Sequence, residues 1–260
     1  MEKSKSKKIE NFASLKMFII VIILTFLTFN FLDTFIFEFT RSFPGLIFSF
    51  FKNIIDPMSD ILDPMNIIIV CILVIIFNAR LNFLLKNDNK KKSLIKKTGL
   101  NQKDIVDSFD YYATICKHFV WSLALAGILC NIFKYIIGVS RPKYFFLEGY
   151  DRLNFFNLEH KVSSFPSGHT QAAFTLAILL LIYINKYNLL ILVCAFLMGI
   201  SRIFMSMHFP SDIIFGAYLG AIIPIILYNN FFREKLRKYD VNKIVSFYQF
   251  LRLFYWRLFI

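Results

Sequence analysis

Three short polar clusters interrupt an otherwise apolar chain, and their residue types suit phosphate chemistry. Ionisable side chains in or beside long apolar segments are costly, so each one is a functional hypothesis by default. We therefore treat the three clusters as one candidate site. They are Lys134 with Arg141-Pro142, then Pro166-Ser167-Gly168-His169, and then Ser201-Arg202 followed by His208 and Asp212.

The cations among these residues predict a site for a phosphate group. Lys134 and Arg141 are seven residues apart, two helical turns, so both can point the same way. Arg202 joins them, and the sequence places no acidic block near the three. Unpaired buried cations need an anion, and the planar guanidinium of Arg pairs readily with phosphate. Ser167 and Gly168 stand where a helix N-terminus offers free N–H groups, so we expect both to help bind the phosphate.

The two histidines of the clusters predict a two-step reaction. His208 and Asp212 are four residues apart, close enough for the carboxylate to hold one ring nitrogen and leave the other to attack phosphorus. His169 would then protonate the leaving oxygen as general acid. The product of the first step is a phosphohistidine, which water hydrolyses. We expect neither a metal nor another cofactor, because the cations already neutralise the developing charge.

Together the clusters resemble the three-part signature of the type 2 phosphatidic acid phosphatases, a superfamily of membrane lipid phosphatases and related soluble acid phosphatases. Every signature position is filled, in order, within residues 115–220. The stretch between the first two clusters looks most like bacterial members, including lipid A 1-phosphatases. The resemblance implies phosphate binding by Lys134, Arg141 and Arg202 with support from Ser167 and Gly168, and it implies His169 as the acid, His208 as the nucleophile and Asp212 as its orienter.

The elements that must position these clusters are membrane-spanning helices. Of the 260 residues, 57% are hydrophobic and 33 are Phe, and the apolar residues come in blocks long enough to cross a bilayer. The predicted fold class is an all-α polytopic membrane bundle of about six transmembrane helices, with short interfacial helices. The blocks are Met17–Phe37, Asn66–Leu85, Ile115–Ile137, Thr170–Ile184, Leu189–Ile203 and Asp212–Tyr228.

Basic residues flank these blocks and predict the orientation of the chain. They cluster before the first block, between the second and third, between the fourth and fifth, and after the last. Six spans put all four clusters on one side, so the positive-inside rule places both termini in the cytoplasm. The three polar clusters then meet at the opposite face, which is periplasmic in a bacterial inner membrane. The formal net charge of +13 is explained by anionic headgroups and not by nucleic acid.

We expect a single integral-membrane domain over residues 1–260, with a basic cytoplasmic N-terminus at 1–16 and an amphipathic cytoplasmic tail at 230–260. The segment Phe43–Phe51 is predicted to lie at the membrane interface, as are Asp33 and His118. The remaining minor features are predicted to be structural: Asp56-Pro57-Met58 and Asp63-Pro64-Met65 as turns or helix starts, Ser140, Ser163 and Ser164 as turn or capping residues, and four unpaired cysteines.

The leading hypothesis is a phosphohydrolase acting on a lipid phosphate at the outer leaflet. Its candidate substrates are lipid A 1-phosphate, undecaprenyl pyrophosphate, phosphatidylglycerol phosphate and phosphatidic acid. A lipid phosphotransferase would use the same site, and acceptor-dependent product formation would reveal it. A metal-dependent enzyme with His160, His169, His208 and Asp212 as ligands would be inhibited by EDTA. A non-catalytic phospholipid-binding or transport protein would keep its function without the histidines. The sequence leaves the oligomeric state undetermined.

Overall fold

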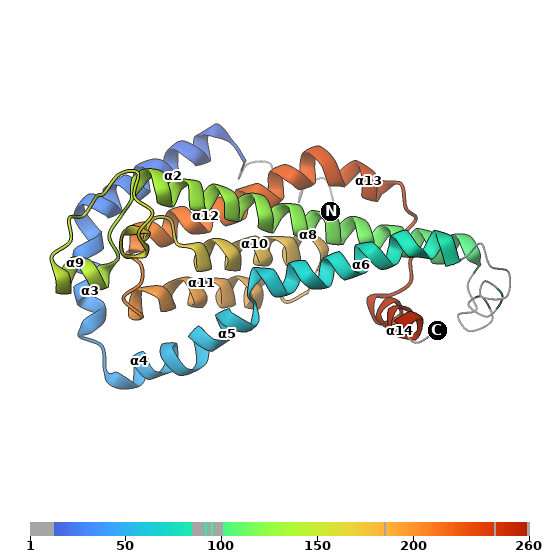
Figure 1. The fold of residues 1–260 in the computed structure, drawn as a ribbon, viewed down its shortest axis with the longest axis horizontal. Helices are drawn as coiled ribbons and strands as arrows, with labels where there is room; N and C mark the ends of the chain where they lie inside the picture. The colour runs from blue at the N-terminus through green and yellow to red at the C-terminus, as the bar shows by residue number, and fades with distance from the viewer. Residues whose placement is uncertain are drawn as a thin grey trace. The chain divides into compact units, whose positions relative to one another are not determined.

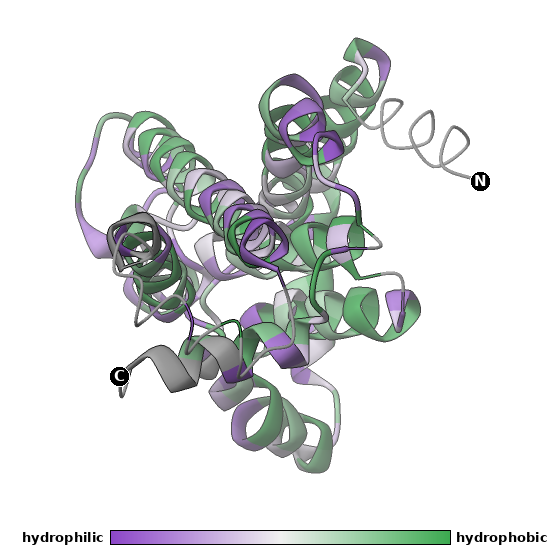
Figure 2. Ribbon diagram, turned by 90° about the vertical axis from the view of Figure 1, so that its right-hand side faces the viewer, coloured by the Kyte–Doolittle hydropathy of each residue, from purple (hydrophilic) through white to green (hydrophobic). Residues whose placement is uncertain are grey.

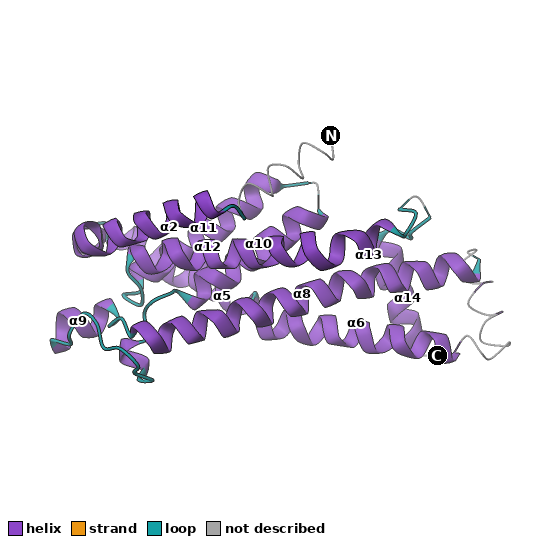
Figure 3. Cartoon of the chain, turned by 90° about the horizontal axis from the view of Figure 1, so that it is seen from above, coloured by secondary structure: helices purple, strands orange, loops and turns teal. Residues whose placement is uncertain are grey.

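The computed structural model describes residues 13–84, 92, 95, 101–184, 186–241 and 243–258. Within these residues the chain consists of helices joined by loops and turns (Figure 3). An isolated antiparallel bridge between Val139 and Leu153 is the one extended pairing found among them. The predicted all-α fold is therefore confirmed.

The described helices follow the predicted apolar blocks, although several of their ends differ. In chain order they are α2 (Leu15–Leu27), η1 (Thr28–Leu32), α3 (Asp33–Arg41), α4 (Gly45–Phe50), η2 (Phe51–Ile55), α5 (Asp56–Ile61), α6 (Pro64–Leu84), α8 (Gln102–Ile137), α9 (Pro142–Glu148), η3 (His160–Val162), α10 (Gly168–Tyr183), α11 (Asn188–Phe204), α12 (Pro210–Leu227), η4 (Tyr228–Phe232), α13 (Arg233–Arg237) and α14 (Phe247–Leu258).

The largest difference is at α8, which begins at Gln102 and not near Ile115. The first turns of α8 carry several aspartates, so a search for apolar blocks does not include these turns. Ile105 and Phe109, four residues apart on one face, are nevertheless buried in a hydrophobic cluster. This part of α8 is therefore an amphipathic helix, and one buried stripe is enough to form it.

Before the second predicted span, the chain is already helical from Gly45 onward. The predicted interfacial segment Phe43–Phe51 thus forms α4 and the first residue of η2. Both Asp-Pro-Met repeats mark helix starts as predicted, since α5 begins at Asp56 and α6 begins at Pro64. Proline is favoured in the first turn, where its missing N–H costs no hydrogen bond.

Four helical stretches are long and apolar enough to cross a membrane, and two shorter apolar helices accompany them. Hydrophobic residues cover most of the described ribbon (Figure 2). The chain is therefore a multi-pass membrane bundle, as predicted. The long stretches are Leu15–Arg41, Gly45–Arg80, Gln102–Ile137 and Pro210–Arg237, and the shorter helices are Gly168–Tyr183 and Asn188–Phe204.

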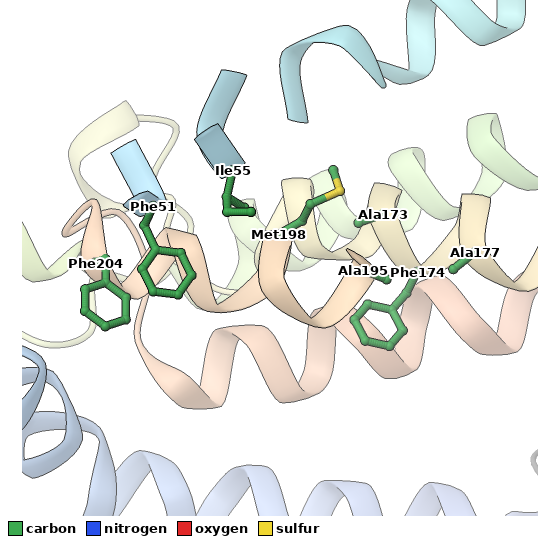
Figure 4. Packing of buried hydrophobic residues seen from close by; sticks show 8 residues of the cluster. All are labelled: Phe51, Ile55, Ala173, Phe174, Ala177, Ala195, Met198 and Phe204. Atoms are coloured by element: carbon green, nitrogen blue, oxygen red, sulfur yellow. The ribbon is translucent and has the colours of Figure 1, made fainter. Parts of the chain in front are cut away.

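The chain divides into two compact units, Met1–Asn66 with Trp121–Ile226 and Ile67–Val120 with Leu227–Ile260. In the first unit, α10 and α11 run side by side (Figure 1). A hydrophobic cluster joins both helices to η2, and in it the rings of Phe51 and Phe204 stack with centroids 4.3 Å apart (Figure 4). This packing brings the start of α5 close to the last turn of α11.

A close approach of two backbones holds α12 against the start of α10. Gly216 and Gly220 are one helical turn apart on α12, and a Cβ added to either would clash with α10 or its cap. The added atom would lie 2.7 Å from the Ser167 carbonyl oxygen at Gly216, and 2.2 Å from the Gln171 carbonyl oxygen at Gly220. Small residues spaced by four allow this contact in membrane bundles. The pair therefore fixes the Pro166–His169 motif against the helix that carries Asp212.

The second unit has its own core, in which the tail packs on α8. Val245 and Phe250 lie in one cluster with Ile105 and Phe109, and Val245 N–H donates to Ser108 Oγ at 3.1 Å. The amphipathic tail predicted at 230–260 is thus helical in part, and its residues 259–260 lie outside the described residues. Most of the predicted basic N-terminus, at 1–12, also lies outside them.

The prediction that His118 is interfacial is wrong. Its side chain is fully buried in the second unit, and its ring stacks on Phe232 with centroids 4.7 Å apart. The pattern misleads because Lys117 precedes it in the sequence, while the aromatic partner is more than a hundred residues away.

Candidate active site

The last turn of α8 and the loop after it carry Lys134 and Arg141. Lys134 Nζ donates to the Ser163 carbonyl oxygen at 2.6 Å, and Arg141 Nη2 donates to Ser163 Oγ at 3.1 Å. Gly138 ends the helix with φ of 59°, and a Cβ there would lie 1.8 Å from the Asn154 carbonyl oxygen, so the turn requires glycine. Two predicted phosphate-binding cations therefore converge on Ser163, a residue predicted only to form a turn.

Backbone hydrogen bonds fix the segment that delivers Arg141. Arg141 N–H donates to the Lys161 carbonyl oxygen at 2.9 Å, and Ser140 N–H donates to the Arg152 carbonyl oxygen at 3.2 Å. The segment is thus held on both sides by parts of the loop that follows it. The carbonyl groups of this loop therefore fix the backbone from which the Arg141 side chain extends.

The Pro166–His169 motif forms the start of α10, with Ser167 as the N-cap. Ser167 Oγ accepts from the N–H of Thr170 at 3.4 Å and from its hydroxyl at 2.9 Å. Ser167 N–H donates to the Asp212 carbonyl oxygen at 3.0 Å. The Ser167 N–H group therefore donates to α12 and not to a ligand. Ser167 joins α10 to α12 as well as bordering the site.

Gly168 and His169 supply the next N–H groups of α10, which have no acceptor within the helix. A Cβ added to Gly168 would lie 3.9 Å from Lys134 Cε, so this end of α10 faces Lys134. All three residues line a cavity of about 290 Å³ whose other walls include Leu62, Leu123, Gly127, Ala173 and Met198. The cavity thus has polar groups suited to phosphate and an apolar wall.

His208 is held by the Ser164 carbonyl oxygen, which lies 2.8 Å from its Nδ1. The predicted partner, Asp212, is farther away, with Oδ2 at 3.6 Å from Nδ1. Asp212 Oδ2 instead accepts from Ser164 Oγ at 2.5 Å and from Phe209 N–H at 2.7 Å. Ser164, predicted to be a turn or capping residue, is fully buried and contacts both members of the pair. Because a carbonyl oxygen only accepts, Nδ1 carries the proton and Nε2 is the nitrogen that can attack.

Arg202 is not an unpaired cation, and that prediction is wrong. Its Nη1 forms an ion pair with Asp56 at the start of α5. The two residues are 146 positions apart, and they meet because the cluster around Phe51 and Phe204 packs η2 and α5 against α11. The Nε atoms of Arg141 and Arg202 are buried without a partner in the described part of the chain. Buried donors of this kind fit an anionic ligand.

The electrostatic setting keeps His208 neutral. Burial lowers its pKa well below 6.5, and the positive charges of Lys134, Arg141 and Arg202 lower it further. The same cluster acts on His160 at the mouth of the site, where the charge of Arg141 lowers the pKa of that exposed imidazole. A neutral imidazole is the nucleophilic form, so the predicted phosphate-binding cations would also keep the predicted nucleophile in that form.

Asp33 is a further residue that the sequence misplaced. It was predicted to be interfacial, yet its side chain is 1% exposed and forms an ion pair with Arg152. Its carboxylate accepts from the N–H and the hydroxyl of Ser211, at 2.8 and 2.6 Å. The partner Arg152 lies in the loop between α9 and η3 and has no motif that would have singled it out.

The fold and the site together define a class: a multi-pass membrane protein with a buried cationic site and a fixed histidine beside it. Comparison with known proteins finds a family match for part of the chain. Residues 116–236 match the family model described as the PAP2 superfamily, which is the superfamily that the sequence motifs resemble.

Two curated relatives share part of this region. A lipid A 1-phosphatase of Rhizobium johnstonii is 34% identical over 113 residues, which cover 43% of this chain and 46% of that protein. An undecaprenyl-diphosphatase of Sulfolobus acidocaldarius is 32% identical over 114 residues, covering 41% and 50%. The matched region thus spans about half the length of these relatives. The crystal structure of Aquifex aeolicus LpxE is 22% identical, with a TM-score of 0.47 over 76% of this chain and 95% of that one.

Proposed function

We propose that this protein hydrolyses a lipid phosphate or pyrophosphate through a phosphohistidine on His208. One observation carries the proposal. The Nδ1 atom of His208 is fixed by a carbonyl oxygen at 2.8 Å, and the charges of Lys134, Arg141 and Arg202 act on the same ring. A fixed neutral imidazole among phosphate-binding cations is the arrangement that nucleophilic attack on phosphorus requires.

In the first step Nε2 of His208 attacks phosphorus, and the bond from phosphorus to the leaving oxygen breaks. His169 gives its proton to that oxygen. The imidazole gains positive charge as the new bond forms, and the carboxylate of Asp212 lies 3.6 Å from its Nδ1. The cations hold the equatorial oxygens, which carry the negative charge of the transition state. Asp212 thus stabilises the phosphohistidine by its charge, and Ser164 orients the ring.

In the second step water attacks the phosphohistidine, and His169 accepts a proton from that water, which restores its acid form. The bond between phosphorus and Nε2 breaks, inorganic phosphate leaves, and His208 returns to its neutral form. The proton and charge balance closes without a metal, because the three cations of the site neutralise the transferred group. We therefore expect phosphate release to continue in excess EDTA, whereas a metal-dependent enzyme would stop.

The cavity beside His169 supports a lipid as the leaving group. Its walls combine that histidine with Leu62, Leu123 and Met198, so a leaving oxygen attached to an apolar chain fits there. The lipids named for the relatives, lipid A 1-phosphate and undecaprenyl diphosphate, are candidates, with phosphatidylglycerol phosphate and phosphatidic acid. The orientation of the basic flanks supports the outer leaflet of a bacterial inner membrane, with the site periplasmic and both termini cytoplasmic.

The test is phosphate release by purified protein from a panel of these lipids, with His208→Ala as the blank. We expect release that vanadate inhibits, together with an acid-labile phosphoenzyme in the wild type. His169→Ala should form that phosphoenzyme slowly. Wild-type turnover by His208→Ala would overturn the mechanism. Product formation that requires a lipid or sugar acceptor would identify a phosphotransferase instead.

A further inference from the structure

A buried ion pair outside the family signature adjoins the proposed catalytic residues. Asp33, at the start of α3, binds Arg152 with one carboxylate oxygen and the Ser211 N–H with the other, at 2.8 Å. The Ser211 hydroxyl adds a third bond, at 2.6 Å. Ser211 lies in the first turn of α12, next to Asp212. A carboxylate from the first span therefore binds the N-terminus of the helix that carries Asp212.

Arg152 packs on the other residue that holds Asp212. Its guanidinium carbon lies 3.5 Å from the centroid of the Phe209 ring. The N–H of Phe209 donates to Asp212 Oδ2 at 2.7 Å. Arg152 also reaches the phosphate-binding side of the site, since its carbonyl oxygen accepts from Ser140 N–H, one residue before Arg141. One arginine thus contacts both segments that deliver reacting groups.

Arg152 is the positive charge that two buried carboxylates, Asp33 and Asp212, share. Asp33 and Asp212 are both buried, at 1% and 0% exposed, and they repel each other. The positive charge of Arg152 attracts both. Removing one member of a buried ion pair leaves an uncompensated charge, which costs far more than removing both members. Loss of Arg152 would therefore leave two neighbouring buried carboxylates without their shared cation.

We propose that Arg152 and Asp33 are positioning residues for the reaction at His208, which rests on the proposed function. Their ion pair fixes the first turn of α12, and Arg152 supplies the positive charge that lets Asp212 remain a carboxylate beside His208. Neither side chain touches the substrate. The pair acts through the position and charge of Asp212.

The test compares Arg152→Gln, Arg152→Lys, Asp33→Asn and the double variant Asp33→Asn with Arg152→Gln. We expect Arg152→Gln to lower kcat by about 30-fold or more, because a buried charge loses its partner, with KM within about threefold. Arg152→Lys keeps the charge and should retain kcat within about tenfold. The double variant removes the excess negative charge and should recover kcat to within about fivefold of wild type.

A matched control is Glu148→Gln, which breaks an exposed ion pair with Lys161 and should leave kcat within about twofold. The losses of a balanced pair should not add, so a double variant worse than Arg152→Gln would overturn the proposal. So would wild-type kcat in Arg152→Gln, or Arg152→Lys as impaired as Arg152→Gln. If Arg152→Gln does not fold, the kcat values of Arg152→Lys and Asp33→Asn test the proposal instead. Asp33→Asn should lower kcat, but by less than His208→Ala does.

Vanadate affinity from thermal shift gives a second measurement that needs no turnover. Vanadate bound to His208 depends on the same Asp212 charge, so Arg152→Gln should weaken it and the double variant should restore it. A wild type that binds vanadate and releases phosphate from none of the lipids would refute the proposed function alone. Equal vanadate affinity in wild type and Arg152→Gln would refute the positioning pair alone.

Discussion

Two adjacent serines in the loop before α10, Ser163 and Ser164, should affect different kinetic constants when each is changed to alanine. Ser164 Oγ donates to Asp212 Oδ2 at 2.5 Å in a fully buried environment. Ser163 Oγ accepts from Arg141 Nη2 at 3.1 Å on the phosphate-binding side. Ser164→Ala should lower kcat and leave KM nearly unchanged. Ser163→Ala should raise KM and leave kcat nearly unchanged.

The magnitudes follow from the kind of hydrogen bond that each variant removes. Asp212 Oδ2 accepts two hydrogen bonds, from Ser164 Oγ and Phe209 N–H, so Ser164→Ala removes one of two. A hydrogen bond to a charged group contributes about 1.5–3 kcal/mol, which is roughly a 10- to 150-fold loss in kcat. The bond at Ser163 also involves a charge, and it orients Arg141 while the Nε donor of that guanidinium stays available for phosphate. We expect roughly a 2- to 10-fold rise in KM for Ser163→Ala.

Both variants keep the backbone contacts, which makes them a matched pair. The Ser164 carbonyl oxygen still holds His208 Nδ1, and the Ser163 carbonyl oxygen still accepts from Lys134. Steady-state phosphate release, divided by the folded fraction from thermal unfolding, measures kcat and KM. The reasoning fails if Ser164→Ala retains kcat within about twofold, or if both variants lower kcat equally, because then the hydroxyls do not divide the two roles.

Four further predictions concern other parts of the site. In Asp56→Asn, Arg202 loses its ion-pair partner in the empty site, whereas bound vanadate still compensates its charge. If the lost ion pair contributes ~1 kcal/mol to the empty site, vanadate should bind the variant about fivefold more tightly. Gly127 lines the cavity and a Cβ there meets nothing within 4 Å, so Gly127→Leu should fold and raise KM for long-chain lipids about tenfold more than for short-chain ones. Gly220→Ala should destabilise the fold by about 3 kcal/mol or more in thermal unfolding, because its Cβ would lie 2.2 Å from a backbone oxygen. Since the pKa of His208 is lowered below 6.5, kcat/KM should stay constant as the pH falls through 6.5 and decline only below it.

Two of these predictions have a control variant within the chain. Ile128 is 57% exposed on the same helix as Gly127, so Ile128→Phe should not change the preference for chain length. Gly45→Ala adds a Cβ in open space and should leave thermal unfolding unchanged, unlike Gly220→Ala. For His208 the stability should fall already as the pH drops below 6.5, before kcat/KM declines, because the unfolded imidazole takes up a proton there while the buried one does not. A decline in kcat/KM centred at pH 6.5 would contradict the prediction for His208. Unchanged vanadate affinity in Asp56→Asn would contradict the prediction for Asp56. An equal rise in KM for long-chain and short-chain lipids in Gly127→Leu would contradict the prediction for Gly127.

The sequence could predict the helices, and it could single out the candidate reacting residues, because both depend on local pattern; the roles of those residues stay a prediction. Apolar blocks locate α10, α11 and α12 to within two residues at most ends. The motif spacing brings His208 and Asp212 to adjacent positions at the start of α12. Neither kind of inference needs a contact between distant segments. The start of α8 escaped because a single buried stripe was enough to make it helical, and the predicted blocks also missed the helix before Asn66 and the helical residues after Tyr228.

The contacts that complete the site could not be predicted in the same way. Ser164 binds Asp212 across 48 positions, and Asp33 binds Ser211 across 178. A serine in a polar turn and an aspartate near a span end have ordinary structural explanations in any single sequence. Their roles depend on which helices pack together, and that is determined by the hydrophobic clusters and by Gly216 and Gly220.

The acids that balance the cations come from outside the region that matches the family. That region covers 116–236 and contains the proposed reacting residues, including Arg202 and His208. Asp33 and Asp56, which pair with Arg152 and Arg202, precede residue 66. A buried cation without its acid favours any anion that can reach it, whereas a paired cation releases its partner only to a ligand that compensates for the loss. We therefore infer that, under the proposed function, Asp33 and Asp56 set how strongly the site holds phosphate, and the residues of the matched region supply the chemistry that acts on it.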